Sequence, residues 1–236
     1  MFVSLAVIFL LMIPIVGYSL SERNQVSLRQ YLMLMRIIWL MILVWLLFFE
    51  PKSFIRWDLL EHYDELNSLR SNNFQYALNY GEYKGLPIAN IYFFLISRME
   101  NNRLFSVIPL FIDGCAFIYI LKNSFQREQV VNFSHITFAA ILWWCTFGFK
   151  LSISGVRCVT AVAIVTVAIY KDVVKRERSL QVLLLYIIPL MIHQFAVVPI
   201  VIRLFALAKH KSIGILAIPA VIQFGSPVAR FLGSLA

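Results

Sequence analysis

Long apolar runs, separated by short polar stretches, repeat along the chain from end to end. Several of these runs approach or exceed the ~20 residues that cross a bilayer as an α-helix. The pattern therefore predicts an all-α, polytopic membrane bundle that forms a single domain over residues 1–236. About seven spanning helices are expected. They lie near 2–20, 31–49, 105–121, 134–149, 157–170, 180–205 and 213–232.

Basic residues in the connecting loops predict how these helices are oriented. Lysine and arginine occur in the loops 21–30, 122–129 and 171–178, and positively charged loops stay on the cytoplasmic side. These loops can share that side only if residues 51–104 form an outer loop without a complete crossing. The apolar stretch Leu86–Ser97 has about twelve residues, which is too short to span a bilayer. It predicts an interfacial or re-entrant half-helix; if it does span, the orientation of every preceding helix inverts.

The same outer loop contains an amphipathic pattern, "FIRWDLLEHYDELNSLR". Its apolar residues and its polar residues each recur at helical spacing, so they fall on different faces of a helix that lies along the membrane surface. Its polar face is either a solvated surface or a set of carboxylates, one of which removes a proton from a hydroxyl group. The residues of that face are Asp58, Glu61, His62 and Glu65.

Composition agrees with a membrane protein, since 61% of the residues are hydrophobic and 14% are charged. Soluble domains are about half apolar and about a quarter charged. The formal net charge of +9 is explained by the basic loops, so it does not indicate nucleic-acid binding. The cysteines Cys115, Cys145 and Cys158 fall in or beside apolar runs and form no CxxC pair. This spacing argues against a disulfide framework or a structural zinc site.

Ionisable residues within the predicted helices are candidates for function, because placing a charge inside a bilayer is costly. Arg36 lies near the cytoplasmic end of its helix and Arg203 near the outer end of its own. From such positions a long side chain can reach the membrane surface. Asp113 stands near the middle of its helix, where a structural role and a functional role are equally compatible with the sequence.

Arg157 and His193 are expected at one depth. Each lies about fourteen residues, or ~21 Å, from the basic turn at 171–179 that joins their helices. Both therefore fall in the outer half of the membrane, beneath the carboxylate-rich outer loop. Each alone has a structural explanation, as an interfacial anchor and as a hydrogen-bonded core histidine. Together they indicate chemistry on an anionic, lipid-linked substrate, since guanidinium binds phosphate and imidazole exchanges protons near neutral pH.

The stretch "SISGVRCVTAVAIVTVAIYKDVVKRERSLQVLLLYIIPLMIHQFAVVPIVI" resembles the EpsG family of Wzy-like bacterial polysaccharide polymerases. The shared pattern is a Ser-Gly-hydrophobic-Arg entry to a helix, a basic turn, and an Ile-His near the outer end of the next helix. Upstream, Asp58 and Tyr63 resemble the family's Asp…Tyr element, so the resemblance extends over roughly 50–205. Relatives carry further helices, so a short or truncated member is expected. The residues that match the main pattern are Ser154, Gly155, Arg157, Ile192 and His193.

The resemblance implies a GT-C-like glycosyltransferase that joins oligosaccharide repeat units carried on undecaprenyl pyrophosphate. The reaction would occur at the outer face of the plasma membrane and would produce an exopolysaccharide, a capsule or an O-antigen. Arg157 would hold the donor pyrophosphate, Asp58 would take the proton of the acceptor hydroxyl, and His193 would orient or protonate the leaving phosphate. The implied substrate-binding residues are Arg56, Glu61, Tyr63, Lys150 and Ser154.

The resemblance also implies which molecules this protein meets. Its partners would be the lipid-linked oligosaccharide, the lipid bilayer, a chain-length regulator and a flippase. No metal, other cofactor or nucleic acid is expected.

Two other classes of protein are compatible with the sequence. A transporter or flippase for a lipid-linked glycan would use Arg157, Asp113 and His193 as a substrate or proton pathway. It predicts polar residues that continue to the cytoplasmic side, and few occur in the inner halves of the helices that carry Arg157 and His193. A non-catalytic subunit of a polysaccharide assembly complex would tolerate alanine at Asp58 and His193.

Overall fold

The computed structural model describes residues 25–48, 58–79, 86–125, 130–132 and 155–207. Within these ranges the fold is helical apart from one short pair of strands, which confirms the all-α prediction for this part of the chain. The helices predicted near 2–20, 134–149 and 213–232 lie outside the described residues.

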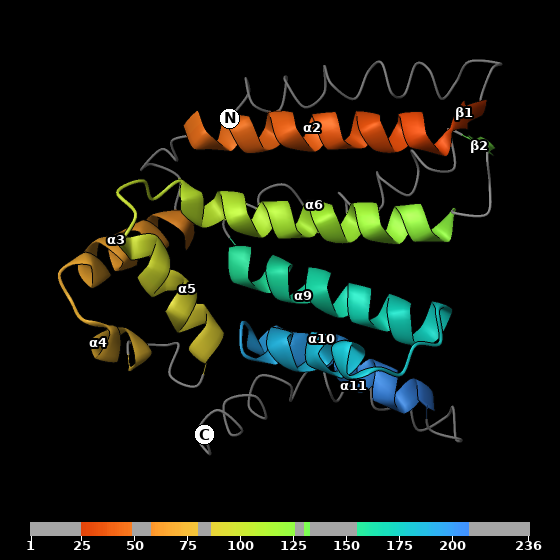
Figure 1. The fold of residues 1–236 in the computed structure, drawn as a ribbon. Helices are drawn as coiled ribbons and strands as arrows, with labels where there is room; N and C mark the ends of the chain where they lie inside the picture. Colours follow the sequence, from red (N-terminus) through yellow and green to blue (C-terminus); the bar gives the residue numbers. More distant parts are fainter. Residues whose placement is uncertain (1–24, 49–57, 80–85, 126–129, 133–154, 208–236) are drawn as a thin grey trace.

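The elements follow one another as labelled in Figure 1. The longest helices are α2 (Leu28–Phe48), α6 (Leu104–Ser124) and α9 (Val156–Ile169), and α9 continues into the π-helical turn η2 (Tyr170–Val174). The shorter helices are α3 (Asp58–Arg70), α4 (Phe74–Leu78), α5 (Pro87–Ser97), α10 (Leu180–Leu190), the 3-10 turn η3 (Gln194–Ala196) and α11 (Val197–Leu207). The strands β1 (Gln25–Ser27) and β2 (Val130–Asn132) pair antiparallel.

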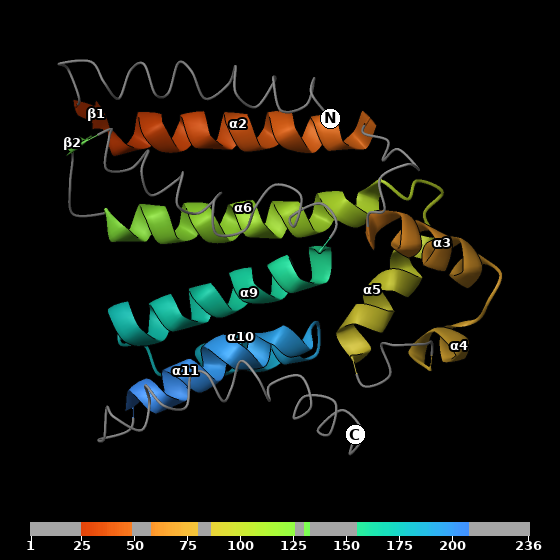
Figure 2. The same ribbon diagram turned by 180° about the vertical axis from the view of Figure 1, so that it is seen from behind.

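The long helices lie side by side in the order α2, α6, α9, with α10 and α11 on the far side of α9 (Figures 1 and 2). The close approach of α2 to α6 depends on Gly114, because a Cβ atom there would lie 2.9 Å from the ring of Trp39. On its other side, α9 packs small and branched residues such as Ala161 and Val165 against Ile192. This layer of helices is the frame that holds the candidate site.

Helices α2 and α6 are the described helices that are long and apolar enough to cross a membrane. Each has 21 residues, or about 31 Å at 1.5 Å per residue, which matches the ~30 Å hydrocarbon core of a bilayer. Large apolar side chains on the outer surface of α2 are exposed, among them Met33, Leu40 and Phe48 at 61%, 61% and 74%. These features are typical of a membrane-spanning helix.

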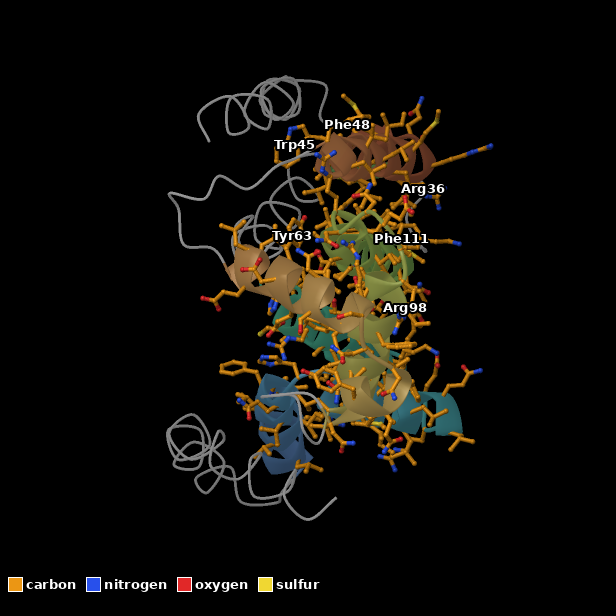
Figure 3. The ribbon with its side chains drawn as sticks, turned by 90° about the vertical axis from the view of Figure 1, so that its left-hand side faces the viewer. Arg36, Trp45, Phe48, Tyr63, Arg98 and Phe111 are labelled. Atoms are coloured by element: carbon orange, nitrogen blue, oxygen red, sulfur yellow. The ribbon has the colours of Figure 1, made fainter. Side chains whose placement is uncertain are left out.

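Helices α3, α4 and α5 form an end cap that covers one end of this layer, where α2 ends and α6 begins (Figures 1 and 2). Figure 3 looks at this end and labels Tyr63 and Arg98 on it. Helix α5 has 11 residues, or about 17 Å, and is therefore too short to cross a bilayer. Arg103, the residue before α6, donates a hydrogen bond to the carbonyl of Leu47 at 3.0 Å and so joins the start of α6 to the end of α2.

The described parts of the basic loops lie at the opposite end of the layer. Strand β1 pairs with β2 there, and Ser124 at the end of α6 donates a hydrogen bond to the Tyr170 hydroxyl at 3.3 Å. The turn that follows η2 lies at the same end (Figure 1). The described parts of the basic loops therefore share one end of the molecule, as their charge predicts.

The prediction of one helix over 180–205 is wrong, because the chain reverses direction within it (Figure 1). Helix α10 ends at Leu190, His193 is extended with φ −155° and ψ 131°, and α11 begins at Val197. A continuous helix would place Pro199 in its interior, where the ring clashes with the preceding turn, whereas the break places it in the first turn of α11. The hairpin also brings Arg203 to the basic end instead of the predicted outer end, since its Nε donates to Asp172 at 2.8 Å.

Candidate functional site

Arg157 stands in the first turn of α9, at the end of the layer that α5 covers. The helix begins after Gly155, and the fully buried Val156 fixes its first turn in the main apolar core. The half-buried Arg157 side chain lies over the ring of Phe93 from α5, with Cζ 5.8 Å from the ring centroid. Such a contact attracts the cation to the face of the ring. Arg157 is therefore held by α5 at this end of the bundle.

His193 lies in the reversal between α10 and α11, at the same end. Its Nδ1 accepts a hydrogen bond from the backbone N–H of Phe195 at 3.1 Å, so it caps η3. This contact assigns the ring proton to Nε2. Burial, with a smaller contribution from the charge of Arg157, lowers the pKa of His193 to about 4. His193 is thus a neutral imidazole at pH 7 that can donate a hydrogen bond through Nε2.

Helix α5 joins these two positions. Its Ala89 N–H donates to the carbonyl of Met191 at 3.4 Å, and Ile88 packs with Ile192 in a shared apolar cluster. Since Phe93 on the same helix lies under Arg157, α5 contacts both the α9 entry and the α10–α11 reversal. The structure therefore brings Arg157 and His193 to one end of the bundle, with α5 packed beside both.

His62 is a residue of this region that the sequence pattern assigned wrongly. It was expected on the polar face of the amphipathic helix, but it is 7% exposed, whereas Glu61 is exposed. Its ring packs against Phe93 and Phe105, with centroids 5.4 and 5.1 Å apart. Its Nδ1 lies 2.9 Å from Glu65 Oε2. The buried face of α3 is formed by Leu59, His62, Leu66 and Leu69.

The signal for His62 was present in the spacing of the buried face. Leu59, His62, Leu66 and Leu69 repeat every three or four residues, which is the period of one helix face. The polar residue type of His62 instead favoured the same face as the carboxylates. The role of Phe93 is not predictable from the sequence, since nothing in an apolar run indicates that one phenylalanine contacts both His62 and Arg157.

Tyr63 occupies a different part of the end cap, near Arg103 and Tyr92. Burial raises the pKa of Tyr63 to about 12, and the charge of Arg103 opposes this shift. The phenol therefore stays protonated at neutral pH and can donate a hydrogen bond. Tyr92 donates its own hydroxyl proton to the carbonyl of Phe105 at 2.6 Å, which fixes α5 against the start of α6.

Arg70 joins α3 to the end of α5 within the end cap. It lies at the last residue of α3 and donates to the backbone carbonyls of Ser97, Met99 and Glu100 at 3.2, 3.2 and 3.1 Å. Arg98 returns a bond to the Arg70 carbonyl at 2.8 Å. These bonds satisfy the carbonyl of Ser97 at the end of α5, which a helix leaves without an intrahelical partner, and carbonyls in the turn that follows it. These hydrogen bonds hold α3 and α5 together, and Phe93 of α5 contacts Arg157.

The remaining predicted residues are placed only in part. Arg56, Lys150 and Ser154 lie outside the described residues, and Asp58 is described only as the first backbone position of α3. Asp113 is 1% exposed within α6, beside the small residue Gly114. Within the described ranges, no three His, Cys, Asp or Glu side chains are placed to hold one metal ion.

Comparisons with family models, with curated proteins and with solved structures return no match. The geometry around Arg157 and His193 is therefore the basis for assigning a function.

Proposed function

We propose that this protein is a multi-pass membrane glycosyltransferase that polymerises oligosaccharide repeat units carried on undecaprenyl pyrophosphate. The growing chain leaves its lipid carrier and passes to a hydroxyl of a new unit at the outer face of the plasma membrane. The observation that carries the proposal is the placement of Arg157 and His193 at one end of the helical layer, where α5 contacts both of the segments that carry them.

Arg157 supplies the charge for the donor pyrophosphate. A guanidinium is permanently charged and planar, so it can form two parallel hydrogen bonds to phosphate oxygens. Its cation–π contact with Phe93 helps to hold it at this end of the bundle. The interaction strengthens as negative charge develops on the leaving pyrophosphate, which lowers the barrier to transfer.

His193 orients the leaving phosphate in this proposal and does not protonate it. Its lowered pKa leaves it neutral, and its Nδ1 is occupied by the Phe195 N–H, so Nε2–H is the group directed at substrate. Asp58, at the start of α3, is the proposed base for the acceptor hydroxyl. Asp58 is the first residue of α3, and Arg70 at the last residue of this helix is bonded to carbonyls at and after the end of α5.

Polymer length in the native host tests the proposal. The gene is deleted and complemented with wild type, Arg157→Ala, His193→Ala or the control Arg36→Ala, and the surface glycan is resolved on a gel. Arg36 is an exposed arginine on α2, so its variant removes the same residue type elsewhere. We expect ladders from wild type and Arg36→Ala, and single repeat units from the other two. A full ladder from well-expressed Arg157→Ala would overturn the assignment.

A lipid-linked glycan transporter is the second candidate, and the buried carboxylate of Asp113 favours it. A carboxylate that is 1% exposed in a membrane-length helix is typical of proton and ion pathways. The two functions differ in where single units accumulate. Loss of a polymerase leaves single units on the cell surface, whereas loss of a transporter keeps them on the cytoplasmic leaflet. Surface labelling of single units in the deletion strain separates the two.

A further inference from the structure

A basic cavity lies at the end of the bundle opposite Arg157, and it is open to solvent with a volume of about 510 Å³. Three arginines and one aspartate are among the residues that line it, so three positive charges less one negative charge leave a formal +2. The residues that line it are Asp172, Val173, Arg176, Arg178 and Arg203. A concave site with this excess of arginine favours an anion.

The carboxylate in the cavity is already bound to protein groups. Arg203 Nε donates to Asp172 Oδ2 at 2.8 Å, and the Tyr186 hydroxyl donates to the same oxygen at 3.2 Å. The hydrogen bond from Arg203 is the main cause that lowers the pKa of Asp172. Asp172 therefore stays ionised and positions Arg203, and it offsets only one of the three arginine charges.

The other two arginines, Arg176 and Arg178, lie in the turn that follows η2. Arg176 has φ 55°, a left-handed conformation that is strained for a residue with a side chain and that often marks a functional position. Glu177 lies between Arg176 and Arg178 in sequence but pairs with Lys171 at 2.8 Å. Glu177 is therefore paired with Lys171, while the exposed Arg176 and Arg178 line the cavity.

An exposed apolar strip begins directly beside the cavity. Helix α10 starts two residues after Arg178, and its side chains Leu180, Leu183 and Leu184 are 70%, 53% and 45% exposed. Val174 on η2 is 61% exposed. A charged cavity that continues into an apolar strip fits an amphiphile with a phosphate head and hydrocarbon chains.

We propose that this cavity binds the phosphate headgroup of an anionic membrane lipid, through Arg176, Arg178 and Arg203. The site is separate from the proposed glycan chemistry and stands whether or not that proposal is correct. The lipid phosphate joins η2 to α11 across the hairpin, at the end of the molecule where the basic loops meet.

Lipid binding to the purified protein in detergent tests this site. Phosphatidylglycerol is titrated against wild type and Arg176→Gln/Arg178→Gln, and bound lipid is counted by native mass spectrometry. Phosphatidylcholine and inorganic phosphate are titrated in parallel. The matched control is Lys122→Gln/Lys175→Gln, which removes two exposed charges at the same end, neither of which lines the cavity. Size-exclusion profiles establish that each variant is folded, and Arg176→Lys/Arg178→Lys keeps the charge if the glutamine variant aggregates.

We expect phosphatidylglycerol to bind the double arginine variant about 30-fold more weakly than wild type, since each of the two surface charges contributes a factor of about five. The control should retain wild-type binding, and the lysine variant should lie between them because it loses bidentate contacts. Equal losses in the arginine and control variants, or equal binding of phosphatidylcholine, would overturn the proposal. Stabilisation by inorganic phosphate with no binding of phosphatidylglycerol would also overturn it, and would assign the cavity to a free phosphate.

Discussion

Phe93 shows how one apolar residue can organise polar ones. Its ring contacts His62 from α3 and Arg157 from α9, with centroid separations of 5.4 and 5.8 Å to the imidazole and the guanidinium carbon. Aromatic contacts of this kind contribute about 0.5–1.5 kcal/mol each. Because both contacts use the same ring, the positions of the two polar groups are coupled through it.

Replacing Arg157 by lysine should separate the contribution of its positive charge to transfer from that of its planar guanidinium group. An ammonium keeps the positive charge but loses the planar fork of the guanidinium, which lies over the ring of Phe93. We expect Arg157→Lys to shorten the polymer ladder strongly, with a loss of about tenfold to a hundredfold in transfer rate if one charge-assisted bond of 1.5–3 kcal/mol is lost. The rate is measured as polymer formed per protein in membranes. Full polymerisation by this variant would show that no bidentate contact to phosphate is required.

The depressed pKa of His193 predicts a loss of stability in acid. The folded pKa is about 4 and the unfolded value about 6.5, so between these pH values the unfolded chain binds more protons than the folded one. Stability therefore falls as the pH drops from 6.5 towards 4, by at most about 3 kcal/mol. Thermal unfolding in detergent across this range should show a shallower pH dependence for His193→Gln than for wild type. Identical profiles would mean that His193 titrates normally.

His62 should stabilise the end cap through its position among aromatic rings. Its replacement by alanine leaves a cavity beside Phe93 and Phe105, at a cost of about 2–4 kcal/mol. The exposed neighbour Glu61 provides the control, since Glu61→Ala removes a side chain of α3 that lies outside the core. Thermal unfolding should show a lower midpoint for His62→Ala alone. Equal midpoints would place His62 outside the packed core.

At the scale of elements, the length of the apolar runs was enough to locate the long helices. The predicted 31–49 and 105–121 correspond to α2 and α6 within a few residues. The reversal within 180–205 was not found, because an apolar run has the same composition whether the chain continues or turns back. The position of Pro199 carried the missing information, since a proline at that point is compatible with a helix start and costly within a helix.

The candidate site was predictable only in part for a related reason. Helical rise placed Arg157 and His193 at one level, and the structure brings them to the same end of the bundle. The contacts that connect them run through α5, from Ala89 to Met191 and from Phe93 to Arg157. Such contacts join segments that are far apart in sequence, and residue spacing within one helix contains no information about them.

The packing of α2 on α6 predicts the effect of a small change at Gly114. A methyl group there would lie 2.9 Å from Cδ2 of Trp39, so Gly114→Ala should destabilise the protein by about 1–2 kcal/mol although alanine favours helices by up to about 1 kcal/mol. Thermal unfolding in detergent measures the change, with Cys115→Ala on the exposed neighbouring position as the control. Adding Trp39→Leu should remove the penalty of the Gly114 variant. A penalty that persists in the double variant would mean that the clash is elsewhere.

At the scale of the whole molecule, the two ends differ in chemistry. One end holds the cap of α3, α4 and α5 above Arg157 and His193, and the other holds the basic turn with Arg176 and Arg178 (Figure 1). Positively charged segments stay on the cytoplasmic side of a membrane. The proposed chemistry and the proposed lipid contact therefore belong to opposite faces of the bilayer, which makes the orientation of the protein a common requirement of both.

Cysteine accessibility tests this orientation directly. In a variant in which Cys115, Cys145 and Cys158 are replaced by serine, single cysteines are introduced at the exposed positions Ser71 in the end cap and Lys175 in the basic turn. A membrane-impermeant maleimide should label Ser71→Cys on intact cells, and Lys175→Cys only after the membrane is permeabilised. The reverse pattern would place Arg157 and His193 on the cytoplasmic side and exclude polymerisation at the outer face. Equal labelling of both sites on intact cells would exclude a spanning topology, because both ends would then lie on one side of the bilayer.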